Sequence, residues 1–191
     1  EKDRLACEVF DLLIREKQLR LLLFKDDRGF RLRSQLEVKP TSRTLNRSDG
    51  RPLQRSLFDF VPEEDFNELE KSVAWFLEAD ARLLWWYRNL SRQDYAIQGW
   101  RRHRIYPDFV FTRAAPDDST DYDRVFVVES KGLFLKNEDT DYKAKVFDLC
   151  NYMVEEKSWS ELSLEFPEKK VIFRVVFEDE WKREIAELLS N

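Results

Sequence analysis

The chain has 191 residues, of which 42% are hydrophobic and 14% aromatic, and its formal net charge is -5. This length and composition suffice for one well-buried domain and exclude a disordered or low-complexity chain. The negative charge argues against a free-standing module that wraps duplex DNA by bulk electrostatics, although it is compatible with a nuclease whose clustered carboxylates hold cations.

The first 52 residues are expected to connect an upstream domain to the rest of the chain. Apolar residues at helical spacing predict a short amphipathic helix over residues 3–18, and two apolar runs around a polar turn predict a β-hairpin over 19–38. The stretch 40–52 is polar and is expected to be a linker. We therefore expect a domain boundary after residue 52, with one domain over 53–191.

The second part of the sequence predicts an α/β fold, a short mixed sheet flanked by helices in the order αβββαβ. Helices are expected over 65–79, 140–157 and 180–189, and strands over 83–87, 105–112, 124–131 and 171–177. The polar loop 114–123 predicts antiparallel pairing of the strands on either side of it. The helix between the last two strands predicts a parallel crossover.

Two of the expected strands carry charged residues where an apolar run meets the edge of the sheet. Glu129 and Lys131 follow the run 125–128, and residues i and i+2 of a strand point to the same face. Asp108 follows Pro107 on the neighbouring strand, so pairing would bring its carboxylate close to Glu129. Two close carboxylates repel each other unless a cation lies between them, and Mg²⁺ prefers such oxygen ligands.

These residues point to metal-dependent phosphodiester hydrolysis. A lysine beside the metal, here Lys131, polarises the attacking water and offsets charge on the scissile phosphate. Taken singly, the residues have simpler explanations, because a lone Asp often forms a turn and a Glu-x-Lys pair is often an exposed strand face. Their order, each at the edge of a buried strand and before a crossover helix, favours the catalytic interpretation.

The pattern Pro107-Asp108 followed by Glu129-Ser130-Lys131 resembles the motif of the PD-(D/E)xK nuclease superfamily. Residues 53–177 are similar to the C-terminal endonuclease domain of type III restriction enzyme Res subunits and related superfamily 2 helicase–nuclease proteins. The similar segments are Ser56-Leu57-Phe58-Asp59, Asn67 with Glu70, Trp86-Tyr87-Arg88-Asn89, and 137–143. The sequence departs from the family's pattern in the Glu129-Ser130-Lys131 centre and in the long Asp-rich insertion over 114–123, but neither departure changes a required side chain.

The resemblance implies a restriction-endonuclease-like αβββαβ core and a Mg²⁺-dependent DNA endonuclease, with Mn²⁺ able to substitute. Asp108 and Glu129 would be metal ligands, the Ser130 backbone carbonyl a third, and Lys131 the catalytic lysine. Glu70 matches the helix acid that completes or orients the metal site through water, and the alternative for it is an ordinary exposed helix residue. A catalytically inactive nuclease fold that binds nucleic acid or acts as a scaffold remains an alternative, as does an RNA substrate.

A basic cluster precedes the Pro-Asp motif. Arg101, Arg102 and Arg104 are expected to contact the phosphate backbone of DNA, with a charged loop tip as the alternative, and Trp100 beside them is a candidate for base stacking. Lys143 begins the second expected helix, where it contacts a phosphate or pairs with a neighbouring acid at i,i+4 spacing.

The expected partners are DNA and an upstream helicase or ATPase domain. The chain starts at Glu1 without a methionine, which suggests the C-terminal piece of a longer protein, and it has no Gly-rich phosphate loop of its own. No apolar run approaches the roughly 20 residues needed to cross a bilayer, so no membrane partner is expected. We expect a cytoplasmic, prokaryotic location, and the sequence leaves the oligomeric state open.

Overall fold

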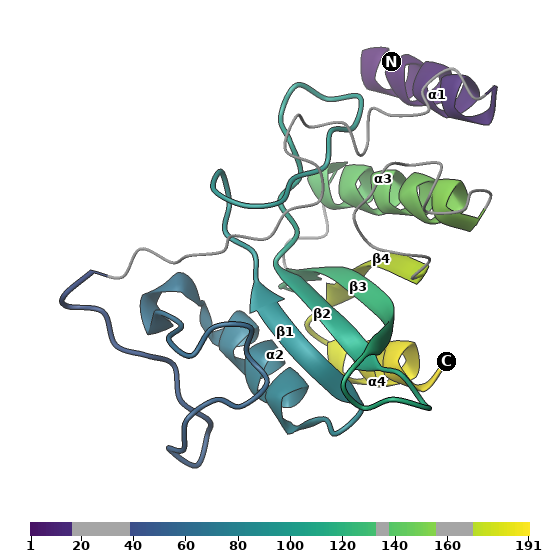
Figure 1. Cartoon of the computed structure of the whole chain (residues 1–191). Helices are drawn as coiled ribbons and strands as arrows, with labels where there is room; N and C mark the ends of the chain where they lie inside the picture. Colours follow the sequence, from purple (N-terminus) through teal and green to yellow (C-terminus); the bar gives the residue numbers. More distant parts are fainter. Residues whose placement is uncertain (17–38, 133–137, 156–169) are drawn as a thin grey trace.

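A four-stranded mixed sheet forms the centre of the chain in the computed structural model, which describes residues 1–16, 39–132, 138–155 and 170–191 (Figure 1). The strands are β1 (Leu83–Arg88), β2 (Phe109–Ala114), β3 (Tyr122–Lys131) and β4 (Lys170–Phe177), and they lie side by side in this order. The antiparallel pairing of β2 with β3 and the parallel pairing of β3 with β4 confirm the topology predicted from the sequence.

Helices cover both faces of the sheet. Helix α3 (Glu138–Glu155) lies on one face with α1 (Lys2–Arg15) on its outer side, while α2 (Glu68–Ala79) and α4 (Trp181–Ser190) lie on the other face (Figure 1). The chain is therefore a mixed α/β protein in layers. Among the described residues, none of the helices combines the length and apolar character that crossing a membrane requires.

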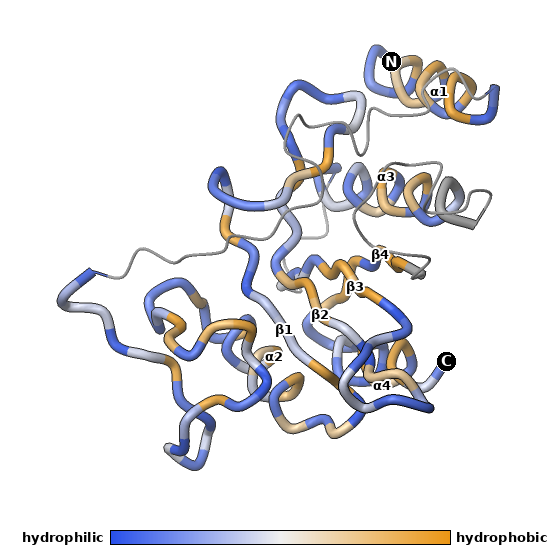
Figure 2. Tube along the Cα trace, in the orientation of Figure 1, coloured by the Kyte–Doolittle hydropathy of each residue, from blue (hydrophilic) through white to orange (hydrophobic). Residues whose placement is uncertain are grey.

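The alternation of side chains along β3 explains the two layers of core. Val125 and Val127 pack in the core on the α3 side, whereas Phe126 and Val128 pack in the core shared with α2 and α4. Successive residues of a strand point to opposite faces, so a strand buried on both faces is apolar at every position. Figure 2 shows hydrophobic colouring over the middle of β3, between hydrophilic ends.

Strand β2, which follows the Pro-Asp motif, begins later than the sequence predicted. It begins at Phe109 and not at Ile105, which instead forms an isolated bridge with Ile97. Pro107 lacks a backbone N–H and cannot take part as a donor in a ladder, so the regular pairing starts after it. Asp108 thus lies just before β2 and not within it.

Helix starts also differ by a few residues from the predictions. Helix α2 begins at Glu68, after the short 3-10 turn η1 (Glu63–Asp65), because Asn67 caps it: Asn67 Oδ1 accepts from the Glu70 N–H at 2.9 Å, and the Glu70 carboxylate accepts from the Asn67 N–H at 2.8 Å. Helix α3 begins at Glu138, two residues before the predicted start at 140.

The described parts of the first 52 residues pack against the rest of the chain. Phe10 and Ile14 of α1 are buried in the core on the α3 side, and Leu45 is buried in the core on the α2 side. The expected hairpin over 19–38 lies outside the described residues. The segment predicted to be a connection thus contributes apolar residues to both cores.

Gly99 is a position where only a hydrogen fits. A Cβ atom there would lie 2.4 Å from Tyr142 Oη and 2.7 Å from Val146 Cγ2, and both side chains belong to the buried face of α3. We expect Gly99→Ala to lower the free energy of unfolding by about 1–3 kcal/mol, since overpacking forces neighbours from their places. Denaturant unfolding measures this, and the added Tyr142→Phe change should recover part of the loss. Equal stability of Gly99→Ala and wild type would contradict the prediction.

Candidate active site

The Pro-Asp and Glu-Ser-Lys motifs meet at one end of the sheet. The Asp108 Oδ2 atom accepts hydrogen bonds from the Ser130 N–H and the Ser130 hydroxyl, both at 2.8 Å. Ser130 lies between Glu129 and Lys131 at the end of β3. The structure therefore brings Asp108 to the segment that the sequence analysis expected it to face.

The backbone of Asp108 is held from both neighbouring segments. Its N–H donates to the Val128 carbonyl at 3.0 Å, and its carbonyl accepts from the Asn89 N–H at 2.9 Å. The buried Asn89 side chain also donates to the Pro107 carbonyl at 2.8 Å. Sequence reasoning noted Asn89 only as part of a similar segment, and its role in fixing the Pro-Asp turn is a finding of the structure.

Glu129 is a buried carboxylate with only one oxygen paired. Glu129 is 2% exposed, and its Oε1 atom lies 2.7 Å from Lys131 Nζ and 2.6 Å from Lys143 Nζ. Its Oε2 atom is buried and has no hydrogen-bond partner within the described parts of the chain. Burial raises the pKa of Glu129, the neighbouring Asp108 charge raises it further, and the two lysines oppose the shift.

Lys143 lies in this site and pairs with Glu129, a partner that its sequence position did not predict. The expected i,i+4 pair with Asp139 is present at 3.7 Å, but Glu129 is the closer partner. Burial lowers the pKa of Lys143, but the Glu129 charge, the hydrogen bond to Glu129 and the Asp139 charge together outweigh it, so the pKa of Lys143 is raised. Whether Lys143 contacts a phosphate stays a prediction.

Glu70 reaches the site through an arginine. Its Oε1 atom lies 2.7 Å from Arg88 Nη2, and Arg88 Nη1 lies 3.2 Å from Asp108 Oδ1. Burial raises the pKa of Glu70, and the Arg88 charge opposes this. Glu70 is 8% exposed, so the alternative that it is an ordinary exposed helix residue is wrong. No sequence signal beyond its place in a similar segment pointed to Arg88.

Acidic and basic side chains pair with one another at this end of the sheet. It combines three acidic and three basic side chains: Glu70, Asp108 and Glu129 with Arg88, Lys131 and Lys143. In the described ranges, no three His, Cys, Asp or Glu side chains converge well enough to hold a metal by themselves. Two carboxylates and the Ser130 backbone carbonyl are the oxygen donors that the motif would offer.

The donors nevertheless fit a hard divalent cation. The unpartnered Oε2 of Glu129 is a buried anionic oxygen, and the adjacent Asp108 charge disfavours its ionisation. A cation between the two carboxylates would satisfy that oxygen and remove the repulsion. Asp108 and Glu129 are therefore the residues that would hold Mg²⁺.

The basic cluster is divided between packing and the surface. The Arg101 guanidinium lies 2.7 Å from an Asp3 carboxylate oxygen in α1 and 4.5 Å from the centre of the Tyr142 ring. Trp100 packs in the same place, with its ring centroid 4.8 Å from that of Tyr142. Both residues thus attach α1 to α3, whereas Arg102 and Arg104 are exposed. Any contact of these arginines with nucleic acid stays a prediction.

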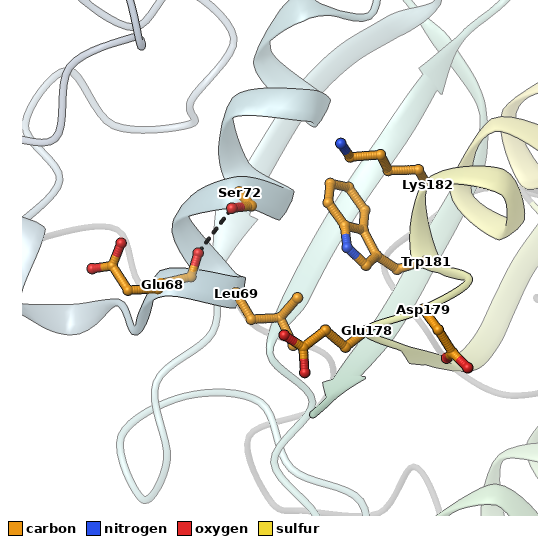
Figure 3. Close-up of a pocket in the computed structure, with 7 residues that line it drawn as sticks. All are labelled: Glu68, Leu69, Ser72, Glu178, Asp179, Trp181 and Lys182. Atoms are coloured by element: carbon orange, nitrogen blue, oxygen red, sulfur yellow. Dashed lines mark hydrogen bonds between the residues drawn. The ribbon is translucent and has the colours of Figure 1, made fainter. Parts of the chain in front are cut away.

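A pocket of about 490 Å³ lies beside the candidate site, between α2 and the start of α4 (Figure 3). It is lined by Glu68, Leu69, Ser72, Glu178, Asp179, Trp181 and Lys182. It adjoins the site because the Glu178 N–H donates to the Lys131 carbonyl at 2.9 Å. Its three carboxylates point in different directions, and their charge disfavours a phosphate, so we assign no chemistry to it.

Chemically, the end of β3 offers the buried carboxylate of Glu129 with two ammonium groups against it, and the half-buried carboxylate of Asp108 with a fixed guanidinium against it. This set can hold a cation and stabilise negative charge on a bound group.

Comparisons of the chain with protein-family models, with curated proteins and with solved structures find no match.

Proposed function

We propose that this chain is a Mg²⁺-dependent DNA endonuclease domain of the PD-(D/E)xK kind, with a restriction-endonuclease-like core. The observation that carries the proposal is the contact of Asp108 with Ser130 beside the unpartnered Oε2 of Glu129. The element order α2–β1–β2–β3–α3–β4 supports it, since it is the αβββαβ order that the motif implies.

The residues of the site suit hydrolysis of a phosphodiester. A bound Mg²⁺ would lower the pKa of a coordinated water and neutralise a phosphate oxygen. Asp108 and Glu129 would hold the ion, and the hydrogen bonds from Ser130 fix the orientation of the Asp108 carboxylate. The Lys131 Nζ lies beside Glu129, where it can orient the attacking water and stabilise the pentavalent transition state.

The motif resemblance also leads us to propose that the domain works within a helicase-coupled restriction or DNA-defence enzyme. The chain has a net charge of -5, and only part of its basic cluster is exposed. Phosphate contacts supply most of the non-specific affinity for DNA, so a second domain would have to provide much of the grip. DNA is proposed as the substrate on the resemblance alone.

A second candidate is a nuclease fold that binds or scaffolds without turnover. The ion pairs of the site favour it, because Lys131 and Lys143 both contact Glu129 Oε1. Metal binding separates the two candidates: a nuclease binds Mn²⁺ through Asp108 and Glu129, whereas a scaffold leaves these carboxylates with the lysines.

Incubation of the purified chain with supercoiled plasmid DNA tests the proposal. We expect nicking or linearisation that requires Mg²⁺, is restored by Mn²⁺ and is stopped by EDTA. A longer protein that contains this chain is the second arm, since it can supply the DNA affinity. Absence of cleavage of DNA and RNA with both metals, in both arms, would overturn the proposed function.

A further inference from the structure

Arg88, the last residue of β1, lies between two of the acids of the site. Its Nη2 atom is 2.7 Å from Glu70 Oε1, and its Nη1 atom is 3.2 Å from Asp108 Oδ1. Its side chain is only 12% exposed. The guanidinium therefore occupies the space through which Glu70 would have to reach Asp108 in order to share an ion with it.

The position of this guanidinium is fixed by further contacts. Arg88 Nη1 also donates to the Asp108 carbonyl at 2.8 Å, and Nε donates to the Asp65 carbonyl at 3.3 Å. The group lies over the rings of Phe66 and Phe109, at 5.7 and 5.4 Å from their centres. A guanidinium carries a permanent charge and a rigid set of donors, so this positive charge stays in place.

The lysines on the other side of the site are held differently. Lys131 and Lys143 both approach the single oxygen Oε1 of Glu129, and their side chains are 16% and 17% exposed. An ammonium on a flexible four-carbon stem can turn aside for an incoming cation. The Glu129 end of the site can thus admit a divalent ion, whereas the Glu70 end already contains an immobile cation.

We propose that Arg88 takes the place of a second metal ion, so that the site binds one divalent cation, at Asp108 and Glu129. Glu70 is then a positioning residue: it holds Arg88 and does not ligate the metal. A second divalent ion between Glu70 and Asp108 would lie against the guanidinium charge in a poorly solvated site, where repulsion is strong. This inference rests on the proposed function and specifies the metal content of its site.

Calorimetric titration with Mn²⁺ tests the inference without measuring activity. We expect one Mn²⁺ per wild-type chain. The Glu129→Gln variant should lose more than about 100-fold in Mn²⁺ affinity, because it removes a ligand, whereas Glu70→Gln should lose less than about tenfold and keep one ion per chain. The Glu70→Gln amide oxygen can still accept from the Asn67 N–H, so the cap of α2 is retained.

Variants of Arg88 add a readout that a purely structural role would not change. Arg88→Gln should bind a second Mn²⁺ per chain, and Arg88→Lys, which keeps the charge, should bind one. Thermal unfolding identifies any variant that fails to fold, and the wild-type and Glu70→Gln titrations decide the question independently of Arg88 variants.

The possible failures can be told apart. Two Mn²⁺ per wild-type chain, or a loss in Glu70→Gln as large as in Glu129→Gln, would overturn the role of Arg88 and leave the nuclease proposal standing. Absence of Mn²⁺ binding to the wild type, or binding that Glu129→Gln does not weaken, would overturn the proposed metal site and this inference with it.

Discussion

Lys131→Met is expected to slow DNA cleavage by roughly 10²–10³-fold at saturating substrate, because it removes a preorganised positive charge from the reacting phosphate. Lys131 lies on the strand that also carries Glu129 and Ser130, so its Nζ is placed by the same rigid element as the proposed metal ligands. Single-turnover cleavage of a labelled duplex measures the effect. The Lys131→Met protein, purified in the same way as the wild type, also shows whether a contaminating nuclease contributes to the cleavage.

Lys143→Met is the matched control, since its Nζ contacts the same oxygen of Glu129 at a similar distance. Lys143 lies on α3 and has Asp139 as a second acidic neighbour. We expect it to act through the charge of Glu129, so that its loss costs roughly tenfold in cleavage rate. Equal effects of the two variants would contradict the distinct role proposed for Lys131, and a larger effect of Lys143→Met would assign the reacting cation to α3.

The sequence predicted the sheet well because hydrophobic periodicity reports burial directly. Each residue of the run Val125–Val128 is buried, and the polar loop between β2 and β3 gave their antiparallel pairing. That pairing also brought Asp108 to the end of β3 near Glu129, as predicted, and its carboxylate contacts Ser130 there. The pairing of β2 with β3 is thus the step that links the sequence pattern to the contact between the two motifs.

Contacts between side chains of different elements could not be predicted in this way. Arg88 meets Glu70 across 18 residues of sequence, and Lys143 meets Glu129 across 14, and no periodicity distinguishes these basic residues from exposed ones. A long side chain can reach several partners, and which one it contacts depends on how the helices are placed on the sheet. The sequence thus identified the motif acids and Lys131 beside Glu129, but not the pairing of Arg88 with Glu70 or of Lys143 with Glu129.

Glu78 is the clearest residue of this kind outside the candidate site. It lies near the end of α2, is 2% exposed, and accepts from Trp86 Nε1 at 3.0 Å, from Arg47 Nη2 at 2.8 Å and from the Gln54 N–H at 2.6 Å. Its carboxylate therefore joins α2, β1 and the segment that precedes α2. Its place in an amphipathic helix gave no indication of this network.

Glu78→Ala is expected to lower the free energy of unfolding by about 3–5 kcal/mol at pH 7, because it leaves a buried indole N–H, backbone N–H groups and the Arg47 charge without their acceptor. Denaturant unfolding measures the change. Glu68→Ala on the same helix is the control: its side chain is 89% exposed, and it should change stability by no more than about 0.5 kcal/mol. A loss for Glu78→Ala no larger than that of the control would contradict the role of this network.

The pH dependence of Glu78→Gln tests whether the charge of the carboxylate matters. Burial raises the pKa of Glu78, but the hydrogen bonds from Trp86, Gln54, Arg47 and Arg55 outweigh it, so the pKa of Glu78 is lowered. A lowered pKa in the folded state means that ionised Glu78 stabilises the fold above its unfolded pKa of about 4.3, and that this contribution is lost as the pH falls through the folded value. The wild type should therefore exceed Glu78→Gln in stability at pH 7, and the difference should shrink below about pH 4. A difference that stays constant from pH 7 to pH 3 would show that the shape of the side chain, and not its charge, holds α2 to the segment before it.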